Sequence, residues 1–473
     1  MRKFKVLAVL TLLVITESFG NKCFTQTNEN YNPVIKHMYT CDPSTIVDNG
    51  TFYLVTGVEK TDTPYNWPFR INSWHIFSST DMKTFKDHGP ILDASAFKWM
   101  TNKSECWASQ IVKKDGKYYW YVCDWGNIGV AVSDNILGPY HDAIGKPLIS
   151  SKDTQFKGYI DPTVYIDDDG RAFLYWGNPN IYYAELNEDM ISIKGEVKKL
   201  EQTVNSFGAP NPDKRVKGEK YKDIYTEGPW FYKRKDNYYL LYAAGGVPEH
   251  IAYSMSKSPV GPWKYMGEIM PLQDTDSFTN HCGVIDYKGN SYFFYHTGKL
   301  PEGGGFGRSV AVEQFEYNAD GTFPVINATQ EGVKPVGSLN PYQRVEAETM
   351  AFSEGVKTEP NDRTGIYVSD IHNGDYIKVR EVDLGKKGAS KLEVSVASAL
   401  RGGIIEVYAD SIGGTLITEI QVPHTGGWEA WKTLETAVKQ GEQAVSGTHD
   451  LYFCFKGRKG CKLFNFDWWK LVE

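Results

Sequence analysis

The sequence predicts an all-β protein in which a five-bladed β-propeller is followed by a β-sandwich of the jelly-roll type. One hairpin pattern occurs five times in the first two thirds of the chain, and short strands fill the last third. No stretch shows a helical period of useful length. A chain of 473 residues is too long for one ordinary core, so at least two domains are expected.

Each copy of the repeat consists of a short strand, a turn rich in Gly, Asp or Asn, and an aromatic-rich strand. Such turns between alternating strands are strong hairpin signals. Hairpins that recur about every 60 residues are typical of a β-propeller, and five copies predict five blades. The alternative is a β-sandwich whose hairpins are similar by accident. The copies begin at Asp42, Trp107, Asp161, Glu227 and His281.

In a propeller, the innermost strand of each blade lines the central channel, so the first residues of successive copies should meet at one end of it. They would bring together three carboxylates, an indole and an imidazole. Converging carboxylates suit glycosidic bond cleavage, in which one acid protonates the leaving oxygen and one carboxylate activates water or attacks carbon. The alternatives are a calcium site and three acids that merely cap the inner strands.

The domain boundaries follow from changes in composition. Residues 28–335 are expected to form the propeller, and a Gly- and Pro-containing linker ends near residue 340. Beyond the linker, short strands are separated by turn signals at sandwich-like spacing, so residues 340–473 are predicted to form the sandwich.

Residues 1–20 are predicted to be a signal peptide, because a basic start precedes a ten-residue apolar run and small residues end it. The run is too short to cross a bilayer, and no other stretch approaches that length, so a secreted or periplasmic protein without a membrane span is expected. Export permits disulfides, and Cys454 with Cys461, which flank a Lys- and Gly-rich turn, is the predicted pair.

Composition narrows the classes of partner. The net charge of −7 argues against nucleic acid, which requires a basic surface. No Cys or His cluster has zinc spacing. The chain contains 30 Tyr, 23 Phe and 13 Trp, which supply flat apolar faces of the kind that sugar rings stack on. A monomer without an organic cofactor is expected.

Three motifs at the repeat starts resemble glycoside hydrolase family 43, over about residues 30–335. They are Asp42-Pro43-Ser44, Ile160-Asp161-Pro162-Thr163 and Thr226-Glu227-Gly228-Pro229. The resemblance implies a five-bladed propeller with inverting chemistry. It implies that Asp42 is the general base, that Glu227 is the general acid, and that Asp161 modulates the pKa of that acid and orients it.

Further segments, among them residues 74–79 and 303–306, resemble the arabinoxylan-debranching members, which remove arabinofuranosyl side chains from xylan. The β-xylosidases and endo-arabinanases of the family share its motifs, so a β-xylosidase is the closest alternative. A non-catalytic binder of plant polysaccharide is the alternative of another class. Arg308 resembles the family's substrate-binding arginine, and the position of His281 is associated with a central ion, often calcium. Trp74 and Trp107 are the candidate sugar platform, and for each of them a role in the core is the alternative.

The last domain resembles a family 6 carbohydrate-binding module, in the segments 344–348, 373–376, 425–431 and 465–468. The resemblance implies a structural calcium held by Glu346, Glu348 and Asp467. It also implies a sugar cleft with two aromatic residues and an amide, for which the candidates are Tyr367, Trp428 and Asn465. The expected ligands are plant cell-wall polysaccharides (arabinoxylan, xylan or arabinan) and their oligosaccharides. The alternative is a domain that only packs against the propeller.

Overall fold

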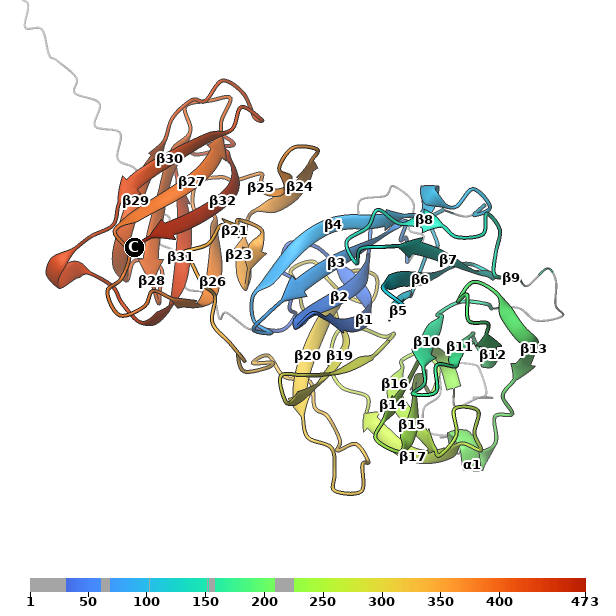
Figure 1. The fold of residues 1–473 in the computed structure, drawn as a ribbon. Helices are drawn as coiled ribbons and strands as arrows, with labels where there is room; N and C mark the ends of the chain where they lie inside the picture. The colour runs from blue at the N-terminus through green and yellow to red at the C-terminus, as the bar shows by residue number, and fades with distance from the viewer. Residues whose placement is uncertain (1–30, 61–68, 102, 151, 153–157, 209–224) are drawn as a thin grey trace, which may run out of the picture.

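The computed structural model describes residues 31–60, 69–101, 103–150, 152, 158–208 and 225–473, and the predicted signal peptide lies outside them. Among the described residues, the regular secondary structure is almost entirely strand (Figure 1). The exceptions are one α-helix and two short 3-10 helices: α1 (Val204–Phe207), η1 (Ala94–Ala96) and η2 (Gly441–Gln443). None of the described helices is long and apolar enough to span a membrane.

Five antiparallel sheets follow one another along the first two thirds of the chain, as the repeat predicts (Figure 1). Blade I contains β1 (Thr40–Asp48), β2 (Thr51–Val58), β3 (Ser73–Ser79) and β4 (Phe85–Asp93). Blade II contains β5 (Gln110–Lys114), β6 (Lys117–Asp124), β7 (Asn127–Ser133), β8 (His141–Asp142) and β9 (Ile149–Ser150). Blade III contains β10 (Thr163–Ile166), β11 (Ala172–Trp176), β12 (Tyr182–Leu186) and β13 (Ile193–Lys199).

Blade IV contains β14 (Tyr225–Arg234), β15 (Asn237–Ala244), β16 (His250–Ser256) and β17 (Lys264–Met270). Blade V contains β18 (Gly283–Tyr287), β19 (Asn290–Thr297) and β20 (Ser309–Phe315). The start of the described chain lies along β20, where Val34 N–H donates to the carbonyl of Val310 at 2.8 Å. The first strands of successive blades contact one another from β1 through β5 and β10 to β14, and β18 contacts β1.

An apolar core lies between each pair of neighbouring blades and closes the ring. Strand alternation gives every blade two apolar faces, and each face is buried against the next blade. One side chain from each of the five cores illustrates the series: Trp74 between blades I and II, Trp176 between II and III, Phe231 between III and IV, Phe293 between IV and V, and Phe52 between V and I. The prediction of a five-bladed propeller is therefore confirmed.

The last third of the chain is a two-sheet sandwich around a single apolar core. One sheet contains β24 (Lys357–Asn361), β25 (Gly365–Ser369), β32 (Asn465–Val472), β27 (Lys391–Ala397) and β30 (Lys432–Ala437), with β21 (Val345–Glu346) beside β32. The other contains β23 (Phe352–Glu354), β26 (Tyr376–Asp383), β31 (Thr448–Lys456), β28 (Gly403–Ala409) and β29 (Thr415–Val422). The remaining strand, β22 (Thr349–Met350), pairs with β4 and so extends blade I.

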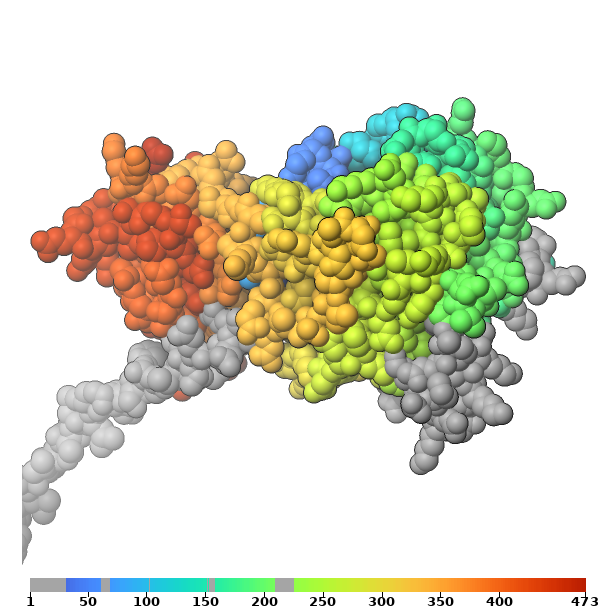
Figure 2. Space-filling view, turned by 90° about the horizontal axis from the view of Figure 1, so that it is seen from below, coloured from blue at the N-terminus to red at the C-terminus, as the bar shows by residue number. Residues whose placement is uncertain are grey.

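The sandwich lies beside the propeller (Figure 2). The segment that follows β20 runs over one face of the propeller before it reaches the sandwich. That segment packs Phe323 against Tyr239 and Tyr253 of blade IV. The predicted disulfide between Cys454 and Cys461 is wrong, because both thiols are free. Cys454 is buried on β31 against Tyr376 and Tyr452, so it is held on the sheet and not bonded to the turn.

Candidate active site

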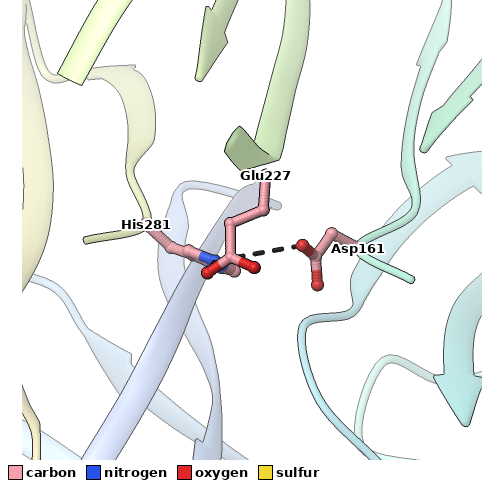
Figure 3. A group of neighbouring side chains, drawn as sticks. All are labelled: Asp161, Glu227 and His281. Carbon is pink, nitrogen blue, oxygen red and sulfur yellow. Dashed lines mark hydrogen bonds and ion pairs between the residues drawn. The ribbon is translucent and has the colours of Figure 1, made fainter. Parts of the chain in front are cut away.

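Four of the five residues that begin the repeats meet at one end of the propeller channel. His281 lies at the centre, with Nδ1 3.3 Å from Asp42 Oδ1 and Nε2 3.4 Å from Glu227 Oε1. The same Nε2 is 3.9 Å from Asp161 Oδ2. Figure 3 shows Asp161, Glu227 and His281 converging from three separate blades. The three predicted carboxylates therefore share one buried site around an imidazole.

The backbone at the start of each inner strand is bent so that these side chains face the channel. Asp42 and Asp161 have φ of +53° and +59°, a left-handed conformation that is uncommon for residues other than glycine. Gly228 adopts φ of +57°, and a Cβ there would lie 2.8 Å from the ring of His281. Its N–H donates to Asp161 Oδ2 at 3.0 Å. Such local strain is maintained where the surrounding structure requires it, often at functional sites.

Asp42 is buried and surrounded by positive or neutral hydrogen-bonding groups. Arg308 Nη1 donates to Asp42 Oδ1 at 3.3 Å, and Asp42 N–H donates to His296 Nε2 at 2.7 Å. Burial raises the pKa of Asp42, but Arg308 and His281 outweigh burial and hold it well below its usual range. Burial lowers the pKa of His296 to about 4, so its Nε2 is free to accept the backbone proton. Asp42 is thus held as a carboxylate.

Arg308 is 3% exposed, and Glu59 fixes its guanidinium. Arg308 Nε and Nη2 lie 2.8 Å and 2.7 Å from Glu59 Oε1, and Arg308 N–H donates to Glu59 Oε2 at 2.7 Å. The guanidinium also lies over the ring of Phe69, 4.7 Å from its centroid. Arg308 therefore reaches the channel as a positioned cation, with Asp42 as one of its partners.

Asp161 and Glu227 behave as a coupled pair of acids. Burial raises the pKa of Asp161 to about 7, and the neighbouring Glu227 charge adds to this rise, although His281 opposes it. Burial also raises the pKa of Glu227, but the hydrogen bond to His281 outweighs burial and lowers it. The pair therefore keeps one proton near neutral pH, and in this arrangement Asp161 carries it.

His281 is the counter-ion of the whole cluster. Burial lowers its pKa, but Asp42, Asp161 and Glu227 outweigh burial and raise the pKa to about 10. The imidazolium separates Asp42 from Glu227, because each of its ring nitrogens faces one of the two carboxylates. A carboxylate held as base on one side and a proton-carrying pair on the other are the groups that acid–base hydrolysis of a glycoside requires.

Four residues of the site were missed from the sequence: Glu59, Asn178, Glu249 and His296. Asn178 donates a hydrogen bond to Glu227 Oε2. Glu249 is buried, and its Oε2 accepts Asn280 N–H at 2.8 Å, which positions the segment that carries His281. Glu59, Asn178 and His296 lie at or just beyond the end of the second strand of a blade, which returns to the same end of the channel, and Glu249 directly precedes the third strand of blade IV. The ends of the predicted hairpins could therefore have indicated most of these residues.

The two tryptophans predicted to form the sugar platform differ in position. Trp74 is completely buried between blades I and II, so its assignment as a sugar platform is wrong. Its Nε1 donates to the carbonyl of Trp107 at 2.7 Å, so it supports the neighbouring rim. Trp107 is partly buried at the rim, where its ring meets Trp125 edge to face with centroids 5.2 Å apart.

Side chains that could hold a metal occur in two places. Among the described residues, the group with ligand atoms all within 4.8 Å of one another is Asp161, Glu227 and His281. His281 Nε2 faces both carboxylates there, at 3.4 Å from Glu227 Oε1 and 3.9 Å from Asp161 Oδ2. In the sandwich, Glu348 Oε2 and Asp467 Oδ1 are buried and accept no hydrogen bond from the described residues. Glu346 lies with them, and Arg344 Nη2 is 2.8 Å from its Oε2 and 3.5 Å from Asp467 Oδ1.

The predicted sugar-binding residues of the sandwich lie together but are mostly covered. Asn465 is 1% exposed and Tyr367 is 4% exposed, whereas Trp428 is half-buried beneath Lys462. Asn465 Nδ2 donates to the carbonyl of Trp428 at 2.8 Å. The Tyr367 ring meets Trp431 edge to face, which places it at the same loop. Asn465 Oδ1 has no hydrogen-bond partner among the described residues.

The geometry agrees with the comparison of the chain with known families. The family model described as "Glycosyl hydrolases family 43" matches residues 31–323, which contain all five blades. The chain belongs to glycosyl hydrolase family 43. The family model described as "Carbohydrate binding module (family 6)" matches residues 346–473, which contain nearly the whole sandwich. The family 43 domain is thus a glycosidase followed by a carbohydrate-binding module.

Individual relatives match along nearly the whole chain. An arabinoxylan arabinofuranohydrolase of Bacillus subtilis is 32% identical, and the match covers 94% of this chain and 93% of that protein. An arabinoxylan arabinofuranohydrolase of Paenibacillus polymyxa is 30% identical over 94% of this chain and 74% of its own length. A crystal structure of the family 43 arabinoxylan arabinofuranohydrolase from Bacillus subtilis, in complex with cellotetraose, matches with a TM-score of 0.81. That match covers 95% of this chain and 99% of the other, at 30% identity.

Proposed function

We propose that this family 43 enzyme removes α-L-arabinofuranosyl side chains from arabinoxylan with inversion of the anomeric centre. The observation that carries the proposal is the site itself, in which Asp42 faces Nδ1 of His281 while Glu227 and Asp161 face Nε2 of the same ring. The choice of arabinose and arabinoxylan is supported by the two relatives named above, which match both domains of the chain.

In the proposed mechanism, Asp42 acts as general base. Arg308 and His281 keep it ionised, so it can take a proton from the attacking water. Glu227 acts as general acid towards the leaving oxygen, and the proton shared with Asp161 supplies it. Asp161 also holds Gly228 N–H, which orients the strand that carries Glu227. Arg308, His281 and the rim residue Trp107 are proposed to contact the sugar.

Inversion is favoured by the position of His281 between base and acid. Inverting glycosidases separate the two carboxyls by about 6.5–9.5 Å to leave room for water, whereas retaining enzymes hold them about 5–5.5 Å apart. In this site each carboxylate touches a different nitrogen of the same ring, at 3.3 Å and 3.4 Å. The two acids are therefore separated by the width of an imidazole and two contacts.

A test of the proposal is product analysis on arabinoxylan. Proton NMR during hydrolysis should show free arabinose first in the anomeric configuration opposite to that of the substrate, and little xylose. Release of xylose from unbranched xylo-oligosaccharides as the main product would instead identify a β-xylosidase. If neither polymer nor aryl glycosides of arabinofuranose or xylose were cleaved, the protein would be a polysaccharide binder.

We also propose that the sandwich binds calcium as a structural ion, through Glu346, Glu348 and Asp467. The donor set fits, because calcium prefers oxygen ligands and two buried carboxylate oxygens there accept no hydrogen bond from the described residues. Burial raises the pKa of Asp467 to about 6, although the charge of Arg344 opposes this rise. Calcium bound here would add stability to the sandwich. We further propose that the protein is exported and that the sandwich has a sugar cleft at Tyr367, Trp428 and Asn465.

The calcium proposal is tested by stability. Chelation with EDTA should lower the Tm of the sandwich, and added calcium should restore it, because a ligand that binds only the folded state stabilises it. The Asp467→Asn variant should show a smaller difference between chelator and calcium. An identical Tm with chelator and with calcium would contradict the assignment.

A further inference from the structure

The channel mouth carries aromatic rings over blades I, II and V, whereas its carboxylates come from blades I, III and IV. The carboxylates of Asp161 and Glu227 come from blades III and IV, where Asn178 also lies. Over blades I, II and V the rim carries five aromatic residues in contact with one another, which we call the aromatic arc. Its members are Trp107, Trp125, Phe69, Phe278 and Phe306.

Two groups of rings make up the arc, and one hydrogen bond joins them. Trp125 meets Trp107 with centroids 5.2 Å apart. Phe306 meets Phe69 at 5.1 Å and Phe278 at 4.9 Å, both edge to face. Trp107 Nε1 donates to the carbonyl of Phe69 at 2.8 Å, which links the two groups across blade I. The arc is therefore one continuous structure from blade II to blade V.

The ends of the arc are the exposed ones. Among the described residues, Trp125 and Phe306 are the only aromatic side chains classed as exposed, at 57% and 51% of their surface. The remaining aromatic side chains of the described chain are buried or partly buried. Exposing two large apolar rings beside an active site costs solvation free energy, which is a reason to expect that a ligand covers them.

Tight turns present both exposed rings in fixed positions. Trp125 lies in the turn between β6 and β7, where Asn127 Nδ2 donates to Asp124 Oδ1 at 2.6 Å. Phe306 lies in a turn closed by two backbone hydrogen bonds between Gly304 and Gly307. A Cβ at Gly305 would fall 1.8 Å from the Phe278 ring, so the turn packs tightly on that ring. Rings on rigid turns lose little entropy when they bind a ligand.

We infer that the aromatic arc holds the main chain of the substrate polymer, with Trp125 and Phe306 stacking on pyranose rings on either side of the branch that enters the channel. The inference rests on the proposed function. If the branch sugar lies at the carboxylates, the chain to which it is attached must cross the rim within about one sugar length. A neutral chain of pyranoses presents C–H faces that suit the aromatic rings of the arc. The arc therefore determines the preference for polymer over small glycosides.

The test compares a polymeric with a small substrate in the full-length enzyme. Stacking rings at the centre of a binding surface contribute about tenfold or more to affinity, so Trp125→Ala and Phe306→Ala should each lower kcat/KM on arabinoxylan by about that factor. On 4-nitrophenyl α-L-arabinofuranoside the same variants should lose less than about threefold, since that substrate has no main chain. Trp125→Phe should recover part of the loss on the polymer.

Two controls separate this inference from the proposed function. Val325→Ala removes an apolar side chain that is 60% exposed on the segment after β20, and it should leave both substrates within about twofold of wild type. In the inactive Glu227→Gln background, gels containing arabinoxylan should retard the protein, and Trp125→Ala should reduce that retardation. The module contributes equally to both proteins.

Equal losses on polymer and aryl glycoside, or no loss on either, would overturn the role of the arc while leaving the glycosidase assignment intact. A wild type that cleaves neither substrate would refute the proposed function instead. In that case, retardation that depends on Trp125 would still support polymer binding by the arc.

Discussion

At the scale of single residues, the site assigns opposite protonation states to neighbouring acids. Asp42 faces Arg308 and His281 and is ionised, whereas the Asp161–Glu227 pair is buried with only a share of one imidazolium and keeps a proton. Environments that push the pKa values of two acids apart mark the base and the acid of a hydrolase. One channel can therefore carry out both halves of the reaction.

The first prediction concerns the two groups that we propose to act on the substrate. Asp42→Asn and Glu227→Gln should each lower kcat on arabinoxylan by about 10³-fold or more, because each removes a proton acceptor or donor of the reaction. Both replacements keep the size of the side chain, so the Tm should remain close to that of the wild type. Asp274→Asn, in a side chain that is 91% exposed, is the matched control and should retain full activity.

The second prediction is the pH dependence created by Asp161. In the wild type, activity should fall as the pH rises through about 7, because the acid pair then loses its proton. In Asp161→Asn, Glu227 no longer shares a proton with a second carboxyl, so the basic limb of the kcat/KM profile should move to lower pH. A lower rate with an unshifted limb would mean that Asp161 only orients Gly228.

Part of the site could be predicted from single residues, and the reason is geometric. Asp42, Asp161, Glu227 and His281 begin equivalent hairpins, and equivalent positions in a propeller converge. Glu59 and Glu249 are acids in unremarkable sequence contexts, and their roles depend on which backbone N–H or guanidinium lies opposite them. Trp74 is completely buried, and its place in the sequence does not reveal that blade II covers it.

At the scale of the element, each blade places residues at the mouth of the channel from two of its strands. The first strand starts there, and the second strand returns there through an antiparallel turn. The sequence pattern identified the starts because they are followed by recognisable turns. His296 and Trp125 lie where the second strands of their blades end. Their place at the mouth can be predicted only after the five-bladed ring has been inferred.

The third prediction belongs to the strands that bury cysteines. None of the six cysteines of the described residues forms a disulfide, and five of them are buried. Alkylation in denaturant without a reducing agent should therefore modify at least six thiols per chain, as counted by mass spectrometry. A reducing agent should leave the Tm unchanged. Fewer than six modified thiols would show that a disulfide, such as the one expected at Cys454, forms in solution.

At the scale of the whole molecule, the two domains share a sheet and a buried acid. Strand β22 from the start of the sandwich pairs with β4, so blade I gains a strand from the second domain. Next to that pairing, Asp87 is 1% exposed and accepts hydrogen bonds from Gly89 N–H at 2.7 Å and from Thr358 Oγ1 of the sandwich at 3.0 Å. His37 Nε2 lies 3.0 Å from its Oδ2. The sequence predicted a linker between two bodies and contained no sign of this contact, which depends on residues 271 positions apart.

The fourth prediction follows from the charge of Asp87. Burial raises its pKa, but the hydrogen bond and charge of His37 outweigh burial and lower it to about 2. Because the pKa is about 3.9 in an unfolded chain, ionised Asp87 stabilises the folded protein above pH 4 by about 2–3 kcal/mol. That stability should be lost as the pH falls from about 4 to about 2. Asp87→Ala should therefore lower the Tm at pH 7 and separate the calorimetric transitions of propeller and sandwich.

The control for Asp87 is an ion pair of the same kind at the surface. Lys117 and Asp134 lie 2.6 Å apart, with side chains 51% and 84% exposed. Water and salt screen such a pair, so Asp134→Ala should leave the Tm nearly unchanged and should not separate the two transitions. An equal effect of both variants would place the stabilisation in general surface charge. A larger effect of Asp87→Ala, which grows from pH 3 to pH 7, would show that a buried carboxylate couples the catalytic domain to its module.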